Sequence, residues 1–197
     1  MSAFQLYKQK RTSNPDDVYI HKMTKKIEIR ESLPGDAGGI EQLYVAAFPD
    51  EDLLPLVREL LDFGQSVISL VATGENGIAG HIIFTFCHVE GGTDKVALLG
   101  PLVIAPTLQK QGIGSALIQS GFQRLKTSET GYVFVLGDPA FYARFGFKAE
   151  YKVVTPYPLP AEWHGAWQSI KLCEAKAAPE GKLSVPEPWR QSALWTS

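Results

Sequence analysis

The sequence predicts an α+β fold, a single domain whose mixed, mostly antiparallel sheet is flanked by helices. Three consecutive β-rich segments within residues 66–104 are joined by short glycine-containing turns, which is typical of an antiparallel meander. Helical patterns precede and follow this meander. A fully apolar segment at 131–136 comes after the later helix, as expected for a buried strand that joins the same sheet.

The first predicted elements are one strand and two helices. Residues 27–30 alternate apolar and polar side chains, which predicts a strand. The apolar residues of 37–48 recur at spacings of three and one, on a single helical face. A second helix is predicted over 52–63, where Gly64 ends it.

The meander comprises predicted strands at 66–73, 78–89 and 95–104. Between the first two lies an Asn-Gly pair, Asn76 and Gly77, which suits a hairpin turn. The turns are short, so each strand should pair with the next one along the chain.

The second half of the chain returns to helical patterning. A helix is predicted over 112–126, followed by the strand at 131–136. Asp138 is a good N-cap, and the proline after it suits the first turn of a short helix that ends at Gly146. Beyond Phe147 the sequence is rich in proline and tryptophan, and we expect one last hairpin with a strand over 168–173.

Composition excludes several classes of protein. Nineteen Lys and Arg against 21 Asp and Glu give a net charge of −2, without the basic excess of a nucleic-acid binder. No apolar run approaches the roughly 20 residues that span a bilayer. The two cysteines form no CxxC motif and suit a reducing compartment. We therefore expect a cytoplasmic protein that binds neither nucleic acid nor membrane.

The chain divides by pattern into three parts. Residues 1–26 are polar and aperiodic and are predicted to be a flexible leader. The patterned sequence, 27–175, is predicted to form the folded domain, and 176–197 a C-terminal extension.

An irregularity marks the third strand of the meander, where Gly100 and Pro101 interrupt an apolar run. Proline cannot donate to a strand ladder, and glycine often marks a bulge. We expect the sheet to bulge or splay at this point. The backbone groups of Leu102 and Ile104, two residues apart, would then be free to pair with an extended ligand that carries amides.

The next segment runs from this strand through a glycine-bearing loop into a helix. Such a junction presents unpaired N–H groups and the positive end of the helix dipole, which suit a phosphate. Gly112 and Gly114 either admit a pyrophosphate to the backbone or permit tight packing of helix on sheet. No lysine follows either glycine, which excludes a P-loop, and Leu117 replaces the third glycine of a dinucleotide fingerprint.

Three motifs together carry a resemblance to a known family. Gln109-x-x-Gly112-x-Gly114 fits an [RQ]-x-x-G-x-[GA] loop, Ile104-x-Pro106 precedes it, and Tyr142 lies before Gly146-Phe147. The chain thereby resembles the GNAT superfamily of acyl-coenzyme A N-acyltransferases, and especially its bacterial YhbS-like subgroup. The resemblance covers residues 27–175 and implies a sheet splayed at the cofactor-binding strand.

This resemblance implies an enzyme that takes acetyl-CoA as co-substrate, without a metal. The acetyl group would pass by direct attack to the primary amine of a small molecule or peptide. The pyrophosphate would lie on Gln109, Lys110, Gln111, Gly112, Ile113, Gly114 and Ser115, and the pantetheine arm on Leu102, Val103 and Ile104. The Leu102 N–H would polarise the thioester carbonyl, and Tyr142 would protonate the departing thiolate.

The general base is left open, because residues 97–104 contain no titratable group. The alternatives are Glu51, Asp52, His81, His88 and Asp138. His81 and His88 are seven residues apart on one strand and so point to opposite faces, which argues against a shared metal. The missing strand carboxylate keeps open a second function, a non-catalytic sensor or interaction module that binds acyl-CoA.

Charge and tryptophan distribution bear on the acceptor. Residues 31–62 hold eight acidic side chains and one arginine, a balance of −7 that either attracts a cationic amine or forms a solvated helix face. All four tryptophans lie in the last 35 residues. They wall the acceptor pocket, form a homodimer contact or cover the core, and these alternatives stay open at the level of sequence.

Overall fold

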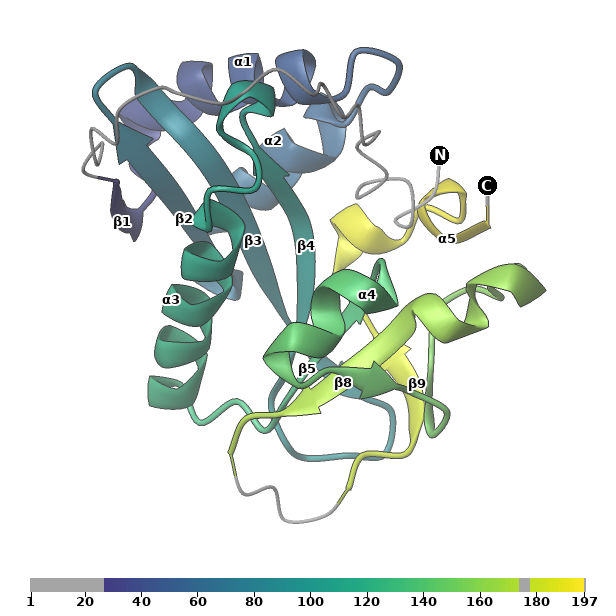
Figure 1. Cartoon of the computed structure of the whole chain (residues 1–197). Coiled ribbons are helices and arrows are strands. Elements are labelled where there is room, and N and C mark those ends of the chain that lie inside the picture. The colour runs from purple at the N-terminus through teal and green to yellow at the C-terminus, as the bar shows by residue number, and fades with distance from the viewer. Residues whose placement is uncertain (1–26, 174–177, 197) are drawn as a thin grey trace.

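The computed structural model describes residues 27–173 and 178–196, and the predicted leader 1–26 lies outside the described residues. The described strands form one nine-stranded sheet with helices on both faces (Figure 1). They are β1 (Glu28–Glu31), β2 (Val67–Gly74), β3 (Gly77–Val89), β4 (Val96–Ile104), β5 (Tyr132–Leu136), β6 (Lys148–Ala149), β7 (Val153–Val154), β8 (Trp167–Lys171) and β9 (Gly181–Ser184). The helices are α1 (Ala37–Ala47), α2 (Leu54–Asp62), α3 (Ile113–Thr127), α4 (Pro139–Tyr142) and α5 (Ala193–Thr196).

The pairing confirms the predicted α+β fold with a mixed, mostly antiparallel sheet. Strands β1 to β4 pair in chain order and antiparallel, and β5 then joins β4 in parallel. The β2–β3 hairpin closes with Gly74 opposite Gly77, which has φ +99°. This φ favours glycine, so the Asn-Gly pair has its expected role.

Helices α1 and α2 cover one face of the sheet and α3 covers the other (Figure 1). Tyr44, Leu60 and Ile83 belong to the core on the α1–α2 side, whereas Phe84 and Leu117 belong to the core under α3. Helix α3 approaches closely at Gly121, where a Cβ would lie 2.1 Å from Phe84 Cε2. A larger residue there would push the helix off the sheet.

The strand expected over 168–173 is present as β8, and it forms the expected antiparallel pair after Phe147 with β6. Strand β8 pairs antiparallel with β5 and β6, whereas β9 pairs with the far end of β3 and with β7. The reason is that β4 occupies only one edge of β5, so the other edge accepts β8. The end of β3 beyond Cys87 likewise extends past the start of β4 and accepts β9.

Three of the four tryptophans cover the core. Trp167, Trp189 and Trp195 are between 0% and 3% exposed and pack on the α1–α2 side of the sheet. Their indole N–H groups donate to Val153 O, Thr85 Oγ1 and Trp189 O respectively. The core-covering role considered for these residues is therefore confirmed.

Candidate functional site

The sheet bulges at Gly100 and Pro101, as the sequence predicts. Ile82 of β3 lies opposite Leu102 of β4, and Phe84 lies opposite Leu99. Two steps along β3 therefore correspond to three along β4, so β4 carries one extra residue. Gly100 has φ +152°, a value that L residues rarely adopt.

Strands β4 and β5 part at this bulge. Their parallel pairs begin at Val96 opposite Tyr132 and end at Leu99 opposite Val135. Strand β4 nevertheless continues for five more residues, to Ile104. Within the described residues, the edge of β4 from Leu102 onward that faced β5 has no strand partner, so the predicted splay is confirmed.

The direction of the backbone groups at this free edge follows from one hydrogen bond. The Ala105 N–H donates to Ala79 O at 2.9 Å, toward β3. Alternate residues of a strand direct their N–H groups to opposite edges. The Val103 N–H therefore faces β3, and the N–H groups of Leu102 and Ile104 face the edge that β5 has left.

The loop after β4 delivers the chain to α3 through two left-handed residues. A 3-10 turn (Pro106–Leu108) is followed by Lys110 with φ +61° and Gly112 with φ +85°. Helix α3 begins directly after Gly112, which carries no side chain to cap it. The first N–H to reach an acceptor within the helix is that of Ala116, bonded to Gly112 O at 3.0 Å.

The N–H groups of Ile113, Gly114 and Ser115 therefore lie at the helix N-terminus without an intrahelical acceptor. Among the described residues, no side chain accepts a hydrogen bond from this end of α3. The helix is 15 residues long, so its dipole adds a positive potential to these three groups. This arrangement suits an anion with several oxygen acceptors.

The two glycines differ in their surroundings. A Cβ on Gly112 would meet nothing within 4 Å, so tight packing does not explain this glycine. A Cβ on Gly114 would lie 3.7 Å from Ile104 Cγ1 and from Phe141 Cζ, which is ordinary van der Waals distance. The backbone at Gly112 is thus open, and its positive φ is what requires glycine.

Phe141 and Arg144 also lie at this end of the helix, and the sequence analysis did not single them out. Phe141 packs beside Gly114, and the Arg144 guanidinium carbon lies 4.5 Å from the Phe141 ring centroid. The exposed Arg144 guanidinium therefore lies over the Phe141 ring, and that ring packs at the α3 N-terminus. The sequence signal that could have identified this pair is an aromatic residue followed three positions later by an arginine in a short predicted helix.

Tyr142 lies where β4 and β5 part. Asp138 caps its helix by accepting from the Ala140 N–H at 2.9 Å. The Tyr142 ring is 2% exposed and lies against Gly137, where a Cβ would come within 2.3 Å of Tyr142 Cε2. Gly137 directly follows β5, and Tyr142 shares one core cluster with Leu102. The Tyr142 ring therefore lies at the end of β5, and its role as a general acid stays a prediction.

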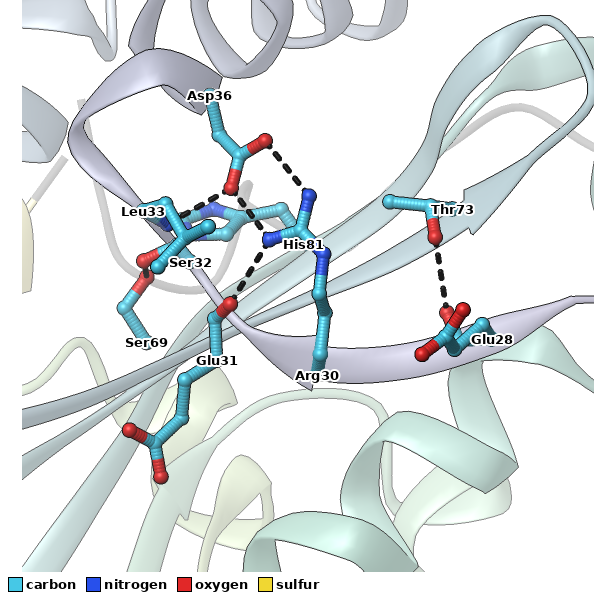
Figure 2. Close-up of polar contacts among 9 residues, drawn as sticks. All are labelled: Glu28, Arg30, Glu31, Ser32, Leu33, Asp36, Ser69, Thr73 and His81. Carbon is cyan, nitrogen blue, oxygen red and sulfur yellow. Dashed lines mark hydrogen bonds and ion pairs between the residues drawn. The ribbon is translucent and has the colours of Figure 1, made fainter.

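His81 is fully buried and held at both ring nitrogens. Tyr44 Oη lies 3.1 Å from Nδ1 and Ser69 Oγ lies 2.8 Å from Nε2. Figure 2 shows Ser69 linked in turn to Ser32, with Asp36 and Arg30 close by. Burial lowers the pKa of His81 to about 3, against the smaller opposing effect of Asp36. A neutral, enclosed imidazole of this kind is poorly placed to accept a proton from a substrate.

Two other candidate bases accept hydrogen bonds from the backbone at the start of a helix. Asp138 caps α4, and Asp52 accepts from the Leu54 N–H at 3.2 Å at the start of α2. His88 is exposed at the far end of β3, opposite Ser184 of β9.

Glu51, in the connection between α1 and α2, differs from the other candidates. Its Oε2 is buried and finds no hydrogen-bond partner among the described residues. Burial, which disfavours the charged carboxylate, raises the pKa of Glu51. Glu51 is thus the candidate base that the structure leaves unassigned.

The acidic region 31–62 is partly neutralised by arginines. Ion pairs join Asp36 to Arg30 at 2.6 Å, Glu41 to Arg58 at 2.7 Å and Glu31 to Arg124 at 3.2 Å. The acids of this region that form no ion pair in the described structure are Asp50, Glu51, Asp52, Glu59 and Asp62. Three of these five are consecutive in the connection between α1 and α2, which concentrates the remaining negative charge there.

The described part of the chain contains no group of three or more His, Cys, Asp or Glu side chains able to hold a metal ion. Within the same residues, no helix has the length and apolar character needed to cross a membrane.

Comparison with known proteins agrees with this geometry. The sequence model of the acetyltransferase (GNAT) domain matches residues 65–149, from the start of β2 to β6. The N-acetyltransferase YjhQ of Escherichia coli K12 is 31% identical over 166 residues, which cover 81% of this chain and 92% of YjhQ.

Two solved structures extend the likeness to the fold. The GNAT family N-acetyltransferase YhbS of Escherichia coli, in complex with CoA, has a TM-score of 0.77 and 26% identity. The match covers 90% of this chain and 99% of YhbS. A GNAT family acetyltransferase of Brucella melitensis, in complex with acetyl-CoA, has a TM-score of 0.68 and 27% identity, and the match covers 84% of this chain and 99% of that one.

Proposed function

Because this chain belongs to the GNAT family of N-acetyltransferases, we propose that it transfers the acetyl group of acetyl-CoA to the primary amine of a small molecule or peptide. One observation carries the proposal. The edge of β4 that β5 leaves carries the outward N–H groups of Leu102 and Ile104, and it leads within ten residues to the uncapped N-terminus of α3. The two described cysteines are unpaired, which suits the cytoplasm.

Acetyl-CoA would lie along this edge and across the helix end. The pyrophosphate accepts hydrogen bonds from the backbone between Gln109 and Ser115, where the dipole of α3 is positive. The pantetheine amides extend along Leu102 to Ile104, in the position that β5 would occupy if it continued to pair with β4. The thioester then lies near Leu102 and Tyr142, which share one core cluster.

The reaction is a direct attack. The lone pair of the neutral amine forms a bond to the thioester carbonyl carbon, and the carbonyl oxygen gains negative charge that the Leu102 N–H stabilises. The carbon–sulfur bond then breaks, and the leaving sulfur takes a proton from Tyr142. The amine nitrogen releases its proton to Glu51, directly or through water, so that the products are an N-acetyl amide and CoA.

We expect Tyr142→Phe to lower kcat and to leave the affinity for CoA nearly unchanged. The substitution keeps the ring packed against Gly137 and removes only the hydroxyl that protonates the thiolate. The loss should be modest, about tenfold, because a thiolate leaves with a lower pKa than an amine. Single-turnover release of CoA measures it. An undiminished rate would show that Tyr142 only fills space.

We expect the preferred acceptor to be a cationic amine that reacts in its neutral form. The acids of the α1–α2 connection that form no ion pair within the described residues attract the cation. This attraction weakens as salt shortens the screening length to roughly 8 Å at 0.15 M. KM should therefore rise with salt, and kcat/KM should rise with pH as the amine loses its proton. Release of CoA from acetyl-CoA, measured with polyamines, aminoglycosides and amino-acid amides, tests both trends.

A matched pair of variants locates the effect. Asp50→Asn removes a charge from the connection that bears the unpaired acids, whereas Glu41→Gln removes one that Arg58 already neutralises. Only Asp50→Asn should raise KM for the cationic amine. A preference for neutral or anionic amines would contradict the proposed acceptor class, and so would a KM that does not change with salt concentration.

A further inference from the structure

We infer that Trp189 is a positioning residue for acetyl transfer, which acts by holding the β4 bulge so that the Leu102 N–H faces the thioester. This inference rests on the proposed function. Trp189 comes from the 3-10 turn Glu187–Trp189, 87 residues after Leu102 in the sequence. It nevertheless reaches the one irregular point of β4.

The indole lies beside Gly100. A Cβ built on Gly100 would lie 3.5 Å from Cη2 of Trp189, so the outer edge of the indole bounds the space into which a side chain at position 100 would project. Gly100 is part of the bulge, and only Pro101 separates it from Leu102. A shift of Gly100 would thus change the orientation of the Leu102 peptide.

The indole itself is fixed from several sides. Its Nε1 donates to Thr85 Oγ1 at 3.0 Å, and Trp189 and Thr85 are 1% and 0% exposed. Thr85 lies on β3 opposite Leu98, next to the bulge on the neighbouring strand. The Trp189 carbonyl accepts from Trp195 Nε1 at 3.0 Å, and the two rings meet edge to face. The ring therefore has little freedom to move away from Gly100.

The two faces of the sheet then have separate tasks. The α3 side carries the anion-binding helix end, and Trp189 belongs to the core on the α1–α2 side. A substitution of Trp189 should disturb the geometry of the bound thioester without disturbing the binding of the pyrophosphate at the α3 N-terminus. A displacement near 1 Å of a reacting geometry costs on the order of 100-fold in rate.

We expect Trp189→Phe to lower kcat by about 10- to 100-fold and to change the Kd for CoA by less than about threefold. Thr85→Val should have the same effect in weaker form, because it removes the acceptor of the indole N–H, and Thr85→Ser should restore activity. The double variant Trp189→Phe/Thr85→Val should lose no more than the worse single variant, since both changes act through one contact.

Trp167→Phe is the matched control. Trp167 is also buried, at 3% exposure, and also donates one indole hydrogen bond, to Val153 O. Both Phe variants should lose similar stability in urea, yet only Trp189→Phe should lose kcat. Equal losses of kcat, or a kcat of Trp189→Phe within twofold of wild type, would overturn the inference.

A second readout needs no acceptor. In protein labelled with ¹⁵N-leucine, the Leu102 amide signal, assigned with Leu102→Ile, should differ between the CoA and acetyl-CoA complexes because only acetyl-CoA offers a thioester carbonyl. This difference should vanish in Trp189→Phe and persist in Trp167→Phe. Persistence in Trp189→Phe overturns the inference. A wild-type chain that binds neither CoA nor acetyl-CoA overturns the proposed function, and the inference falls with it.

Discussion

Gly112→Asp should weaken the binding of CoA by roughly 100-fold, whereas Gly112→Asn should weaken it far less. Position 112 precedes α3 with φ +85°, and a Cβ there meets nothing within 4 Å. Asn and Asp both tolerate this left-handed backbone better than other side chains do. The two variants therefore share shape and strain and differ only in charge.

The size of the effect follows from electrostatics. A carboxylate near 4 Å from a phosphate raises the energy by about 4 kcal/mol at an effective dielectric constant of 20, and solvent exposure reduces this. A remaining penalty of about 2.7 kcal/mol corresponds to the 100-fold change. Titration calorimetry with CoA at two salt concentrations measures it, and the gap between the variants should narrow at high salt.

Gly38→Asp supplies the control for added charge alone. Gly38 lies in α1 and also has no neighbour within 4 Å of a Cβ, so a carboxylate there leaves the α3 N-terminus undisturbed. It should bind CoA as the wild type does. Equal affinities for Gly112→Asp and Gly112→Asn would place the pyrophosphate somewhere other than the start of α3.

The parts of the site that sequence predicts are those determined by local covalent constraints. Pro101 cannot donate a hydrogen bond to a strand ladder, and Gly100 accepts an unusual φ. These two adjacent residues are therefore enough to predict the bulge. Gly112, predicted as the first residue of the helix, lies just before it with a positive φ that glycine accepts without strain. In each case the backbone conformation follows from the residue type, whatever the rest of the chain does.

The parts that sequence misses depend on contacts between distant segments. Strand β9 is only four residues long, and its pairing with β3 joins residues about 95 apart. The sequence leaves the role of Trp189 open among three alternatives, and its position beside Gly100 is determined only by the fold. The same holds for His81, whose ring nitrogens are occupied by Tyr44 and Ser69 of other elements, and for Glu51, whose Oε2 is buried without a partner among the described residues.

His81 should make the fold sensitive to acid at a pH well above that of ordinary carboxylate titration. Its burial holds the folded-state pKa at about 3, whereas an unfolded histidine titrates near 6.5. Between these values the unfolded chain binds a proton that the folded chain does not. The free energy of unfolding should therefore be fully retained above pH 6.5 and fall by about 1.4 kcal/mol per pH unit below it.

The loss should reach about 4 to 5 kcal/mol by pH 3, a large share of the stability of a domain of this size. Arg30 holds the pKa of Asp36 at about 2, so the Asp36 contribution is lost only below about pH 4. The raised pKa of Glu51 has the opposite effect on stability. The folded chain binds a proton at Glu51 more readily than the unfolded chain does, so acid favours the folded state at this residue. The part of the slope between pH 6 and pH 4.5 that depends on the His81 ring is therefore the part that reports on His81.

Urea unfolding followed by tryptophan fluorescence at pH 7, 6, 5 and 4.5 measures this slope. His81→Gln removes the titrating ring and should flatten the slope over that interval, even though the loss of the bonds to Tyr44 and Ser69 lowers stability at pH 7. A slope unchanged by His81→Gln would mean that the imidazole becomes protonated in the folded state. The comparison also separates two causes of a falling acetylation rate in acid, because protonation of the amine leaves the protein folded, whereas protonation of His81 requires it to open.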